Sequence, residues 1–399
     1  MRKLNKTAAC GILAAALAAG TLSGCSKAID GTKTVATVGD EKVTLGLASY
    51  MVRDQQAQTT SYYNMLMSQY GVSGSASNVW DQKGDDGKTV GESSKDGVMT
   101  TINQLYVLKA HAADYDVTIT DDEEKAIKEA AAEFIKDNDE KILKKLAVSE
   151  DDIVTYLELV TIRSKMHDPM TADVDTEVSA NEKDQTRVTI VKVSTEGTEK
   201  DDDGNTIDLT DEEKAQKKDL AQQVLDKVKA SDDVANADMD ALAKEVDDSL
   251  SATAPAFTTA GDTDDTLDEA VQDAALELKD GEVADKVIEG DDGYYVVRLD
   301  KMLDEDATEN KEKTVISERK SDLFDSTLED WVKEEKIKVK DKVWDQITVT
   351  DSVSFVYKSA DSSDDTKSSD AQDSTEDTSS QDNSEDTTTE DTAAEDSAE

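Results

Sequence analysis

Residues 267–299 read LDEAVQDAALELKDGEVADKVIEGDDGYYVVRL, and they carry the clearest structural pattern in the chain. This pattern predicts a helix over residues 267–278 and a strand over residues 294–300. A glycine-containing turn lies between the two. A helix that leads through a turn into a strand is typical of a mixed α+β domain.

A strand and two helices are predicted upstream of this stretch. Apolar and polar residues alternate over Arg187–Val193, as in a half-buried strand. Thr210-Asp-Glu-Glu213 is a capping box that opens a long helix, and a short helix follows around Met239–Val246. The predicted order is strand, three helices, strand, and residues 183–302 suffice for one α+β domain.

Several segments of this domain resemble the parvulin-type (PpiC) peptidyl-prolyl isomerase family. They are VQDAAL at 271–276, GEVA at 281–284, GYYVVRL at 293–299 and MDALAKEVDDS at 239–249. Two departures accompany the resemblance. The family's first histidine falls on Thr189 or Ile190 and its second on Tyr295, and the glycine-rich segment of the family is replaced by Ala254–Gly261. The resemblance therefore leaves open whether isomerase activity survives.

The resemblance also implies a set of site residues. Leu267 and Val271 would line the pocket for the proline ring, with Phe257 nearby, and Tyr295 together with Asp248 or Ser249 would form the polar side. Prolyl isomerisation requires rotation about a partial double bond and no nucleophile, so a pocket that favours the twisted amide is enough. The alternative is that the apolar residues are ordinary helix-to-sheet core.

A largely helical domain is predicted over residues 35–182. It opens with a small hairpin over Val35–Thr44, and VATVGDEKVT resembles the start of the N-terminal domain of PrsA/SurA-like extracytoplasmic foldases. Helices are expected over Lys95–Tyr115, after the capping box Thr120-Asp-Asp-Glu123, and after Ser149. Pro169 and the polar run Thr171–Gln185 mark its end. The apolar residues expected in surplus on this domain are Tyr62, Tyr63, Met65, Met67 and Tyr70.

A return segment and an acidic tail follow the mixed domain. Residues 303–357 contain a charged helix over Lys311–Glu335 and a strand-like run at Val343, Trp344, Ile347 and Val349. In the family that the chain resembles, this segment packs on the N-terminal domain. Residues 358–399 are almost entirely Asp, Glu, Ser and Thr, and such a tail should be disordered because it cannot offset its ordering entropy.

The first residues have the form of a bacterial lipoprotein signal peptide, residues 1–24. A basic start and a short apolar core lead to Leu22-Ser23-Gly24-Cys25, which resembles a lipobox in which Cys25 carries the lipid and becomes the mature N-terminus. Residues 25–34 would be a linker. The expected location is the extracytoplasmic face of the cell membrane, with more than one acyl chain, such as palmitate, for stable attachment.

Composition excludes several classes of function. The formal net charge of -48 argues against binding to nucleic acid or to anionic lipid by charge. The two histidines, His111 and His167, have no nearby cysteine or acidic triad, and Asp201–Asp208 fails the spacing of a calcium loop. We therefore expect no cofactor and no metal.

The sequence supports two leading functions. The first is a lipid-anchored foldase that binds newly exported, unfolded polypeptides and acts as a chaperone, a peptidyl-prolyl isomerase, or both. The second is a non-catalytic peptide-binding or assembly lipoprotein built on a degenerate parvulin scaffold. A solute-binding lipoprotein is disfavoured because no pair of α/β lobes is indicated. Whether two molecules pair as a homodimer is left open.

Overall fold

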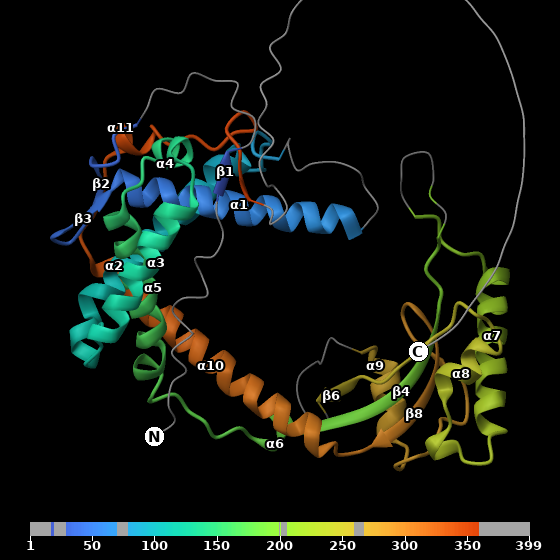
Figure 1. Cartoon of the computed structure of the whole chain (residues 1–399). Helices are drawn as coiled ribbons and strands as arrows, with labels where there is room; N and C mark the ends of the chain where they lie inside the picture. The colour runs from blue at the N-terminus through green and yellow to red at the C-terminus, as the bar shows by residue number, and fades with distance from the viewer. Residues whose placement is uncertain are drawn as a thin grey trace, which may run out of the picture. The chain divides into compact units, whose positions relative to one another are not determined.

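The computed structural model describes residues 17–19, 29–69, 79–198, 200, 206–258 and 267–358 (Figure 1). By its internal contacts the chain divides into Met1–Tyr357 and Lys358–Glu399. Cys25, Tyr70 and the acidic tail from Ser359 onward lie outside the described residues. The described residues form a mixture of helices and sheets, which confirms the α+β fold class.

Helices dominate the N-terminal part of the chain from Leu45 to Met170 (Figure 1). This part, together with the strands and side chains that share its core, is called the helical body below. The buried side chains of its helices, such as Ile102, Leu105, Ile153 and Leu157, meet in one large core. Capping boxes open α2, α3 and α5. The side chains of Thr89, Thr120 and Ser149 each accept a bond from the backbone N–H three residues later, and the backbone N–H of each donates to the carboxylate of that later residue. The helices are α1 (Leu45–Gln69), α2 (Val90–His111), α3 (Asp121–Asp137), α4 (Glu140–Leu146) and α5 (Glu150–Met170).

The helix expected over Lys95–Tyr115 differs from α2 at both ends. The helix begins at Val90, because the Thr89 capping box fixes its first turn. It ends at His111, after which Ala112–Tyr115 forms a 3-10 helix. On α1, Tyr62, Tyr63 and Met65 are exposed by 58%, 37% and 61%, so the expected apolar surplus lies at the surface there.

A small sheet joins the start of the body to the return segment. Its strand order is β3-β2-β9, with β2 (Thr34–Val38) and β3 (Glu41–Thr44) forming the hairpin and β9 (Ile337–Val339) pairing antiparallel with β2. The hairpin turn uses Gly39 at a φ of +55°, which a side chain would strain. The helix α10 (Glu305–Glu334) precedes β9 and buries Phe324 and Leu328 in the core of the body.

The prediction of a strand-like run at Val343, Trp344, Ile347 and Val349 is wrong. Val343 and Trp344 lie in the short helix α11 (Asp341–Trp344), and Ile347 and Val349 follow in irregular backbone. Trp344, Ile347 and Val349 are all buried in the core of the body. The apolar spacing therefore reports burial of this segment and not the pleat of a strand.

A second pairing joins the two ends of the described chain. The strand β10 (Phe355–Tyr357) pairs antiparallel with β1 (Leu17–Ala19), which lies within the predicted signal peptide. Leu17 is only 2% exposed and belongs to the core of the body. The sequence patterns predicted no strand at either position.

The mixed domain is built on a sheet of order β5-β4-β8-β7, with β6 also paired to β4. The long central pair is β4 (Gln185–Ser194) and β8 (Gly293–Lys301), and the shorter strands are β5 (Ala252–Thr253), β6 (Ala256–Thr258) and β7 (Ile288–Glu289). Its helices are α6 (Ala180–Lys183), α7 (Asp211–Lys229), α8 (Met239–Lys244) and α9 (Glu269–Leu276), and Val234–Asn236 is a 3-10 helix.

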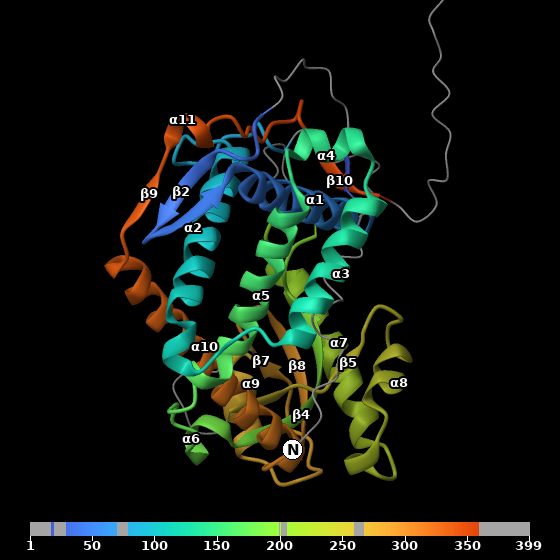
Figure 2. The ribbon, with the colours of Figure 1, turned by 60° about the vertical axis from the view of Figure 1, so that its left-hand side comes forward.

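In Figures 1 and 2, α9 lies on one side of β4 and β8, and α7 and α8 lie on the other. An apolar cluster lies on each face of the sheet. On one face, Val191, Val193, Tyr294 and Val296 pack against α7 and α8. On the other face, Val188, Ile190, Tyr295, Val297 and Leu299 pack against α9 and Phe257. Adjacent residues of β4 and β8 thus belong to opposite clusters, as the pleat of a strand requires. No helix in the described ranges is both long and apolar enough to span a bilayer.

Candidate functional site

The α9 face of the mixed sheet contains four of the six predicted site residues: Tyr295, Leu267, Val271 and Phe257. Tyr295 of β8 lies directly opposite Lys192 of β4, and Ile190 lies opposite Val297. Side chains alternate between faces along each strand, so Ile190 and Lys192 share the face of Tyr295, whereas Thr189 points to the other face. Of the two positions considered for the first missing histidine, Ile190 therefore shares this face with Tyr295.

A polar group forms where β4 and β8 meet this face. The Tyr295 hydroxyl donates a hydrogen bond to Oδ1 of Asp292, and the Lys192 ammonium donates one to Oδ2 of the same carboxylate. The Lys192 Nζ atom lies 6.0 Å from the centroid of the Tyr295 ring. The Asp292 side chain is 43% exposed, so this group opens to solvent although the Tyr295 ring is buried.

The shared carboxylate sets the protonation of the group. Burial by itself would raise the pKa of Asp292, but the bonds from Lys192 and Tyr295 outweigh it and hold that pKa below its usual range. Burial, and then the Asp292 carboxylate, raise the pKa of the Tyr295 hydroxyl. At neutral pH the group therefore presents the Asp292 carboxylate and a neutral Tyr295 hydroxyl that can donate a hydrogen bond.

The neighbouring strands border this group. Thr253 and Ala252 of β5 lie opposite Ile190 and Val191. Ile288 of β7 lies opposite Tyr295, so Lys192, Tyr295 and Ile288 form one row across the sheet.

The three residues predicted to line the pocket for the proline ring belong to the same apolar cluster as Tyr295. Phe257 and Val271 are both 0% exposed, and Leu267 is partly buried against them. Leu267 is therefore the one of the three with a side chain partly open to solvent. The structure brings Leu267, Val271, Phe257 and Tyr295 together in one cluster.

Asp248 and Ser249 occupy a different setting. Both are exposed in the loop that follows α8, and the Ser249 hydroxyl donates to Oδ1 of Asp247 at 2.6 Å. The next residue, Leu250, is buried in the cluster on the opposite face of the sheet. No hydrogen bond among the described residues joins Asp248 or Ser249 to Tyr295.

Lys192 and Asp292 were not predicted from the sequence as site residues. One signal was available, because Lys192 interrupts the apolar alternation of a strand at a position that shares a face with apolar residues. The partner strand and its register decide what faces Lys192, and a single sequence does not supply that register.

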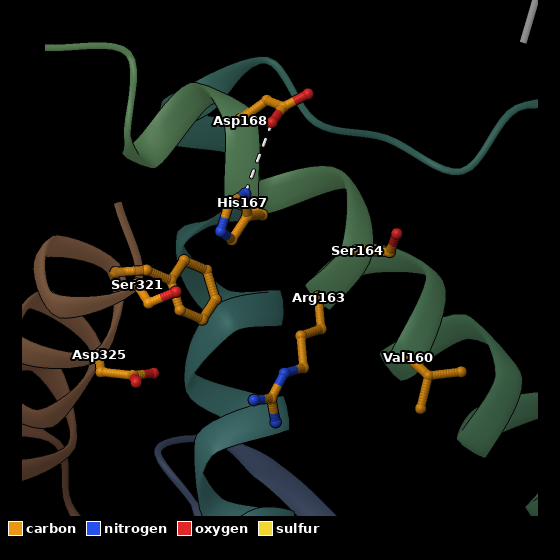
Figure 3. Close-up of a pocket in the computed structure, with 8 residues that line it drawn as sticks. Val160, Arg163, Ser164, His167, Asp168, Ser321 and Asp325 are labelled. Atoms are coloured by element: carbon orange, nitrogen blue, oxygen red, sulfur yellow. Dashed lines mark hydrogen bonds and ion pairs between the residues drawn. The ribbon is translucent and has the colours of Figure 1, made fainter. Parts of the chain in front are cut away.

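A second site lies in the helical body, between α5 and α10. A cavity of about 570 Å³ is lined by Val160, Arg163, Ser164, His167, Asp168, Ser321, Phe324 and Asp325 (Figure 3). A smaller cavity of about 220 Å³ shares Val160 and Arg163 with it and extends to Met51, Leu105 and Tyr156. The two cavities thus adjoin along α5 at Val160 and Arg163. The lining of the larger cavity is mainly polar, with Val160 and Phe324 as its apolar residues.

Both histidines pack on aromatic rings of α10. His111 stacks on Trp331 with a centroid distance of 4.1 Å and an interplanar angle of 16°. His167 lies 5.4 Å from the ring of Phe324. In the described ranges no group of three or more His, Cys, Asp or Glu residues is arranged to hold a metal ion.

Comparison with known proteins identifies the mixed domain. Residues 200–312 match the family of the PPIC-type PPIASE domain. The match begins after β4, the strand on which the first family histidine is missing. No curated protein sequence matches the chain.

Solved structures of foldases are similar to the chain at low identity. The foldase protein PrsA from Lactococcus lactis is 14% identical, with 78% of this chain and 96% of that chain covered and a TM-score of 0.31. The peptidylprolyl isomerase PrsA from Bacillus cereus is 19% identical, with 66% and 94% covered and a TM-score of 0.29. A SurA-like chaperone from Campylobacter jejuni is 10% identical, with 77% and 99% covered and a TM-score of 0.26.

The family match covers the helices α7, α8 and α9 and the strand β8 that frame the candidate site. By this match, residues 200–312 are a domain of the PPIC type, which is the parvulin type of peptidyl-prolyl isomerase domain.

Proposed function

We propose that the chain is a membrane-anchored extracytoplasmic foldase that binds newly exported, unfolded polypeptides and accelerates their prolyl isomerisation. The isomerase part is supported by the PPIC-type match over residues 200–312 and by the polar group on the α9 face of that domain. The location is supported by the lipobox-like Leu22–Cys25 segment, with Cys25 as the lipidated residue.

The Tyr295 hydroxyl is the donor in this proposal. As a prolyl amide twists out of plane, its nitrogen loses resonance and becomes a hydrogen-bond acceptor, so a donor to that nitrogen favours the transition state over the planar ground state. The Tyr295 hydroxyl would move its hydrogen bond from the Asp292 carboxylate to the proline nitrogen. The Asp292 carboxylate would keep its hydrogen bond from Lys192. Leu267 would contact the proline ring.

The test compares two adjacent tyrosines. Tyr295→Phe removes the donor, whereas Tyr294→Phe makes the same change on the opposite face of the same strand. We expect Tyr295→Phe to lower kcat/KM for a short Xaa-Pro peptide by about five- to tenfold, the equivalent of one hydrogen bond, and Tyr294→Phe to leave it unchanged. Equal rates for the native chain and both variants would refute the assignment of Tyr295.

Polypeptide binding is assigned to the adjoining cavities along α5. Val160 lines both of them, so Val160→Asp places a charge on the apolar wall that they share. We expect this variant to suppress aggregation of an unfolded client several-fold less well, while Xaa-Pro isomerisation is unaffected. The control is Thr314→Asp, which adds the same charge at an exposed position of α10. Equal loss in both variants would show a charge effect without a binding site at Val160.

The second candidate is a non-catalytic peptide-binding lipoprotein on the same scaffold. Two observations favour it: tyrosine replaces the second family histidine, and Val271 and Phe257 are fully buried. An uncatalysed rate of isomerisation at high protein concentration, with suppression of aggregation retained, would establish this candidate in place of the enzyme.

A further inference from the structure

The pairing of β1 with β10 puts part of the predicted signal peptide inside the fold. Leu17, Ala18 and Ala19 lie opposite Tyr357, Val356 and Phe355 in an antiparallel pair. The Leu17 side chain is 2% exposed within the core of the helical body. Its backbone N–H donates to Oδ1 of Asn138 at 2.9 Å.

The surface that receives β1 is held in place without it. Tyr357 donates its hydroxyl hydrogen to Asp54 of α1 at 3.0 Å, and Gln56 of α1 donates to the Val353 carbonyl at 2.7 Å. Phe355 is 2% exposed beneath the guanidinium of Arg53, 4.9 Å from the ring centroid. The Nδ2 atom of Asn138 donates a hydrogen bond to the carbonyl of Phe134. This bond fixes the orientation of the Asn138 Oδ1 atom, which accepts the Leu17 N–H.

Cleavage before Cys25, which is part of the proposed function, would remove β1 and leave this surface open. The edge of β10 would lose its backbone partner, Asn138 would lose the donor to its buried oxygen, and the space filled by Leu17 would be empty. An unpaired strand edge and an unsatisfied buried acceptor are both unfavourable. Together they are complementary to an extended peptide that supplies backbone N–H and C=O groups and one apolar side chain.

We propose that the edge of β10, with Asn138 and the space filled by Leu17, binds an extended apolar segment of a client polypeptide, and that the leader occupies this site in the precursor. Because Leu17 of the seated strand is buried in the core, a client segment needs an apolar residue at that position. The chain's own linker is a poor occupant, because Ile29 already packs against the core elsewhere. The inference rests on the proposed cleavage, and it adds a further peptide site to those proposed at Tyr295 and along α5.

The test uses a fluorescent peptide of residues 14–22, AAALAAGTL, as the probe. Its control is the same peptide with Leu17→Asp. Three proteins are compared in one detergent buffer: the chain from residue 26, the full chain with Cys25→Ala, and the full chain with Cys25→Ala and Ala18→Pro. The last of these keeps the leader but removes the N–H through which Ala18 could pair with β10.

We expect saturable binding to the chain from residue 26, and binding about tenfold or more weaker to the full chain that retains β1. Ala18→Pro should restore binding to the full chain, so the result does not depend on how the shortened chain folds. The Leu17→Asp peptide should not bind. Equal binding to the two full-chain forms, or equal binding of the two peptides, overturns the proposal.

The outcome is separable from that of the proposed function. Tyr295→Phe lies in the mixed domain and should leave binding of the leader peptide unchanged. Mass spectrometry of the chain isolated from bacterial membranes reports the cleavage separately. A chain that retains residues 1–24 would overturn the lipobox assignment, whereas the peptide titrations would still decide the β10 site.

Discussion

Asp304 is the residue that fixes the start of α10 to the mixed sheet. Its carboxylate accepts bonds from the backbone of Asp306 and Ala307, both at 3.1 Å, and it is paired with the guanidinium of Arg187 on β4. The Arg187 guanidinium, followed by the Ala307 amide, holds the pKa of Asp304 below its usual range. One side chain thus acts both as a helix N-cap and as an ion-pair partner.

Two substitutions at Asp304 separate these roles. Asp304→Asn keeps a capping oxygen and should cost roughly 1 kcal/mol at neutral pH, and Asp304→Ala should cost about 1 kcal/mol more by removing the cap. Because the folded pKa is depressed, the charge contribution is present above the unfolded pKa of about 3.9 and is lost as pH falls through the folded value. Urea denaturation at about pH 7 and about pH 3 measures this.

The control for Asp304 is Asp306→Asn, which removes a charge from the same first turn at an exposed position. The account predicts little change for this variant. A difference between the native chain and Asp304→Asn that persists unchanged at acidic pH would contradict the ion-pair contribution.

At the scale of elements, α10 is attached to the body by aromatic stacking. Trp331 stacks on His111 of α2 and also lies 5.9 Å from Tyr115, and Phe324 and Leu328 of the same helix are buried. The strand β9, which pairs with β2, follows directly. The stacking should therefore stabilise the pairing of β9.

Trp331→Ala should destabilise the body by about 2 kcal/mol through lost ring contacts and apolar burial, with Trp331→Phe retaining most of this. The direct observable is hydrogen exchange: amides of β9 should lose protection in the alanine variant while those of β8 keep theirs. Unchanged protection in β9 would show that α10 does not support this strand.

Elements with strong local patterns could be predicted from the sequence. The helix and strand expected within residues 267–300 correspond to α9 and β8, and the capping boxes at Thr120 and Thr210 open α3 and α7 as expected. The short helix α11 was predicted as a strand because the spacing of its apolar residues reflects which of them are buried and not a strand pleat. Propensity alone does not separate the two cases in so short a segment.

At the scale of the whole molecule, long-range pairing is what the sequence did not reveal. The pairing of Leu17 with Tyr357 and of Ala36 with Val339 joins residues at opposite ends of the chain, and short strands carry little pattern of their own. The resemblance to the parvulin-type family identified the mixed domain, and the match over residues 200–312 confirms it. The Lys192–Asp292 pair required the three-dimensional register of β4 and β8.

In the proposed function, the prolyl peptide binds the face of the mixed sheet that carries Tyr295 and not the face that carries Tyr294. The most direct test is a titration of the chain carrying isotope-labelled tyrosine with a short Xaa-Pro peptide, followed by NMR, with each ring signal assigned by its Tyr→Phe variant. We expect the ring signals of Tyr295 to shift saturably with added peptide and those of Tyr294 to remain unchanged. Shifts at Tyr294 alone, or at neither ring, would contradict it.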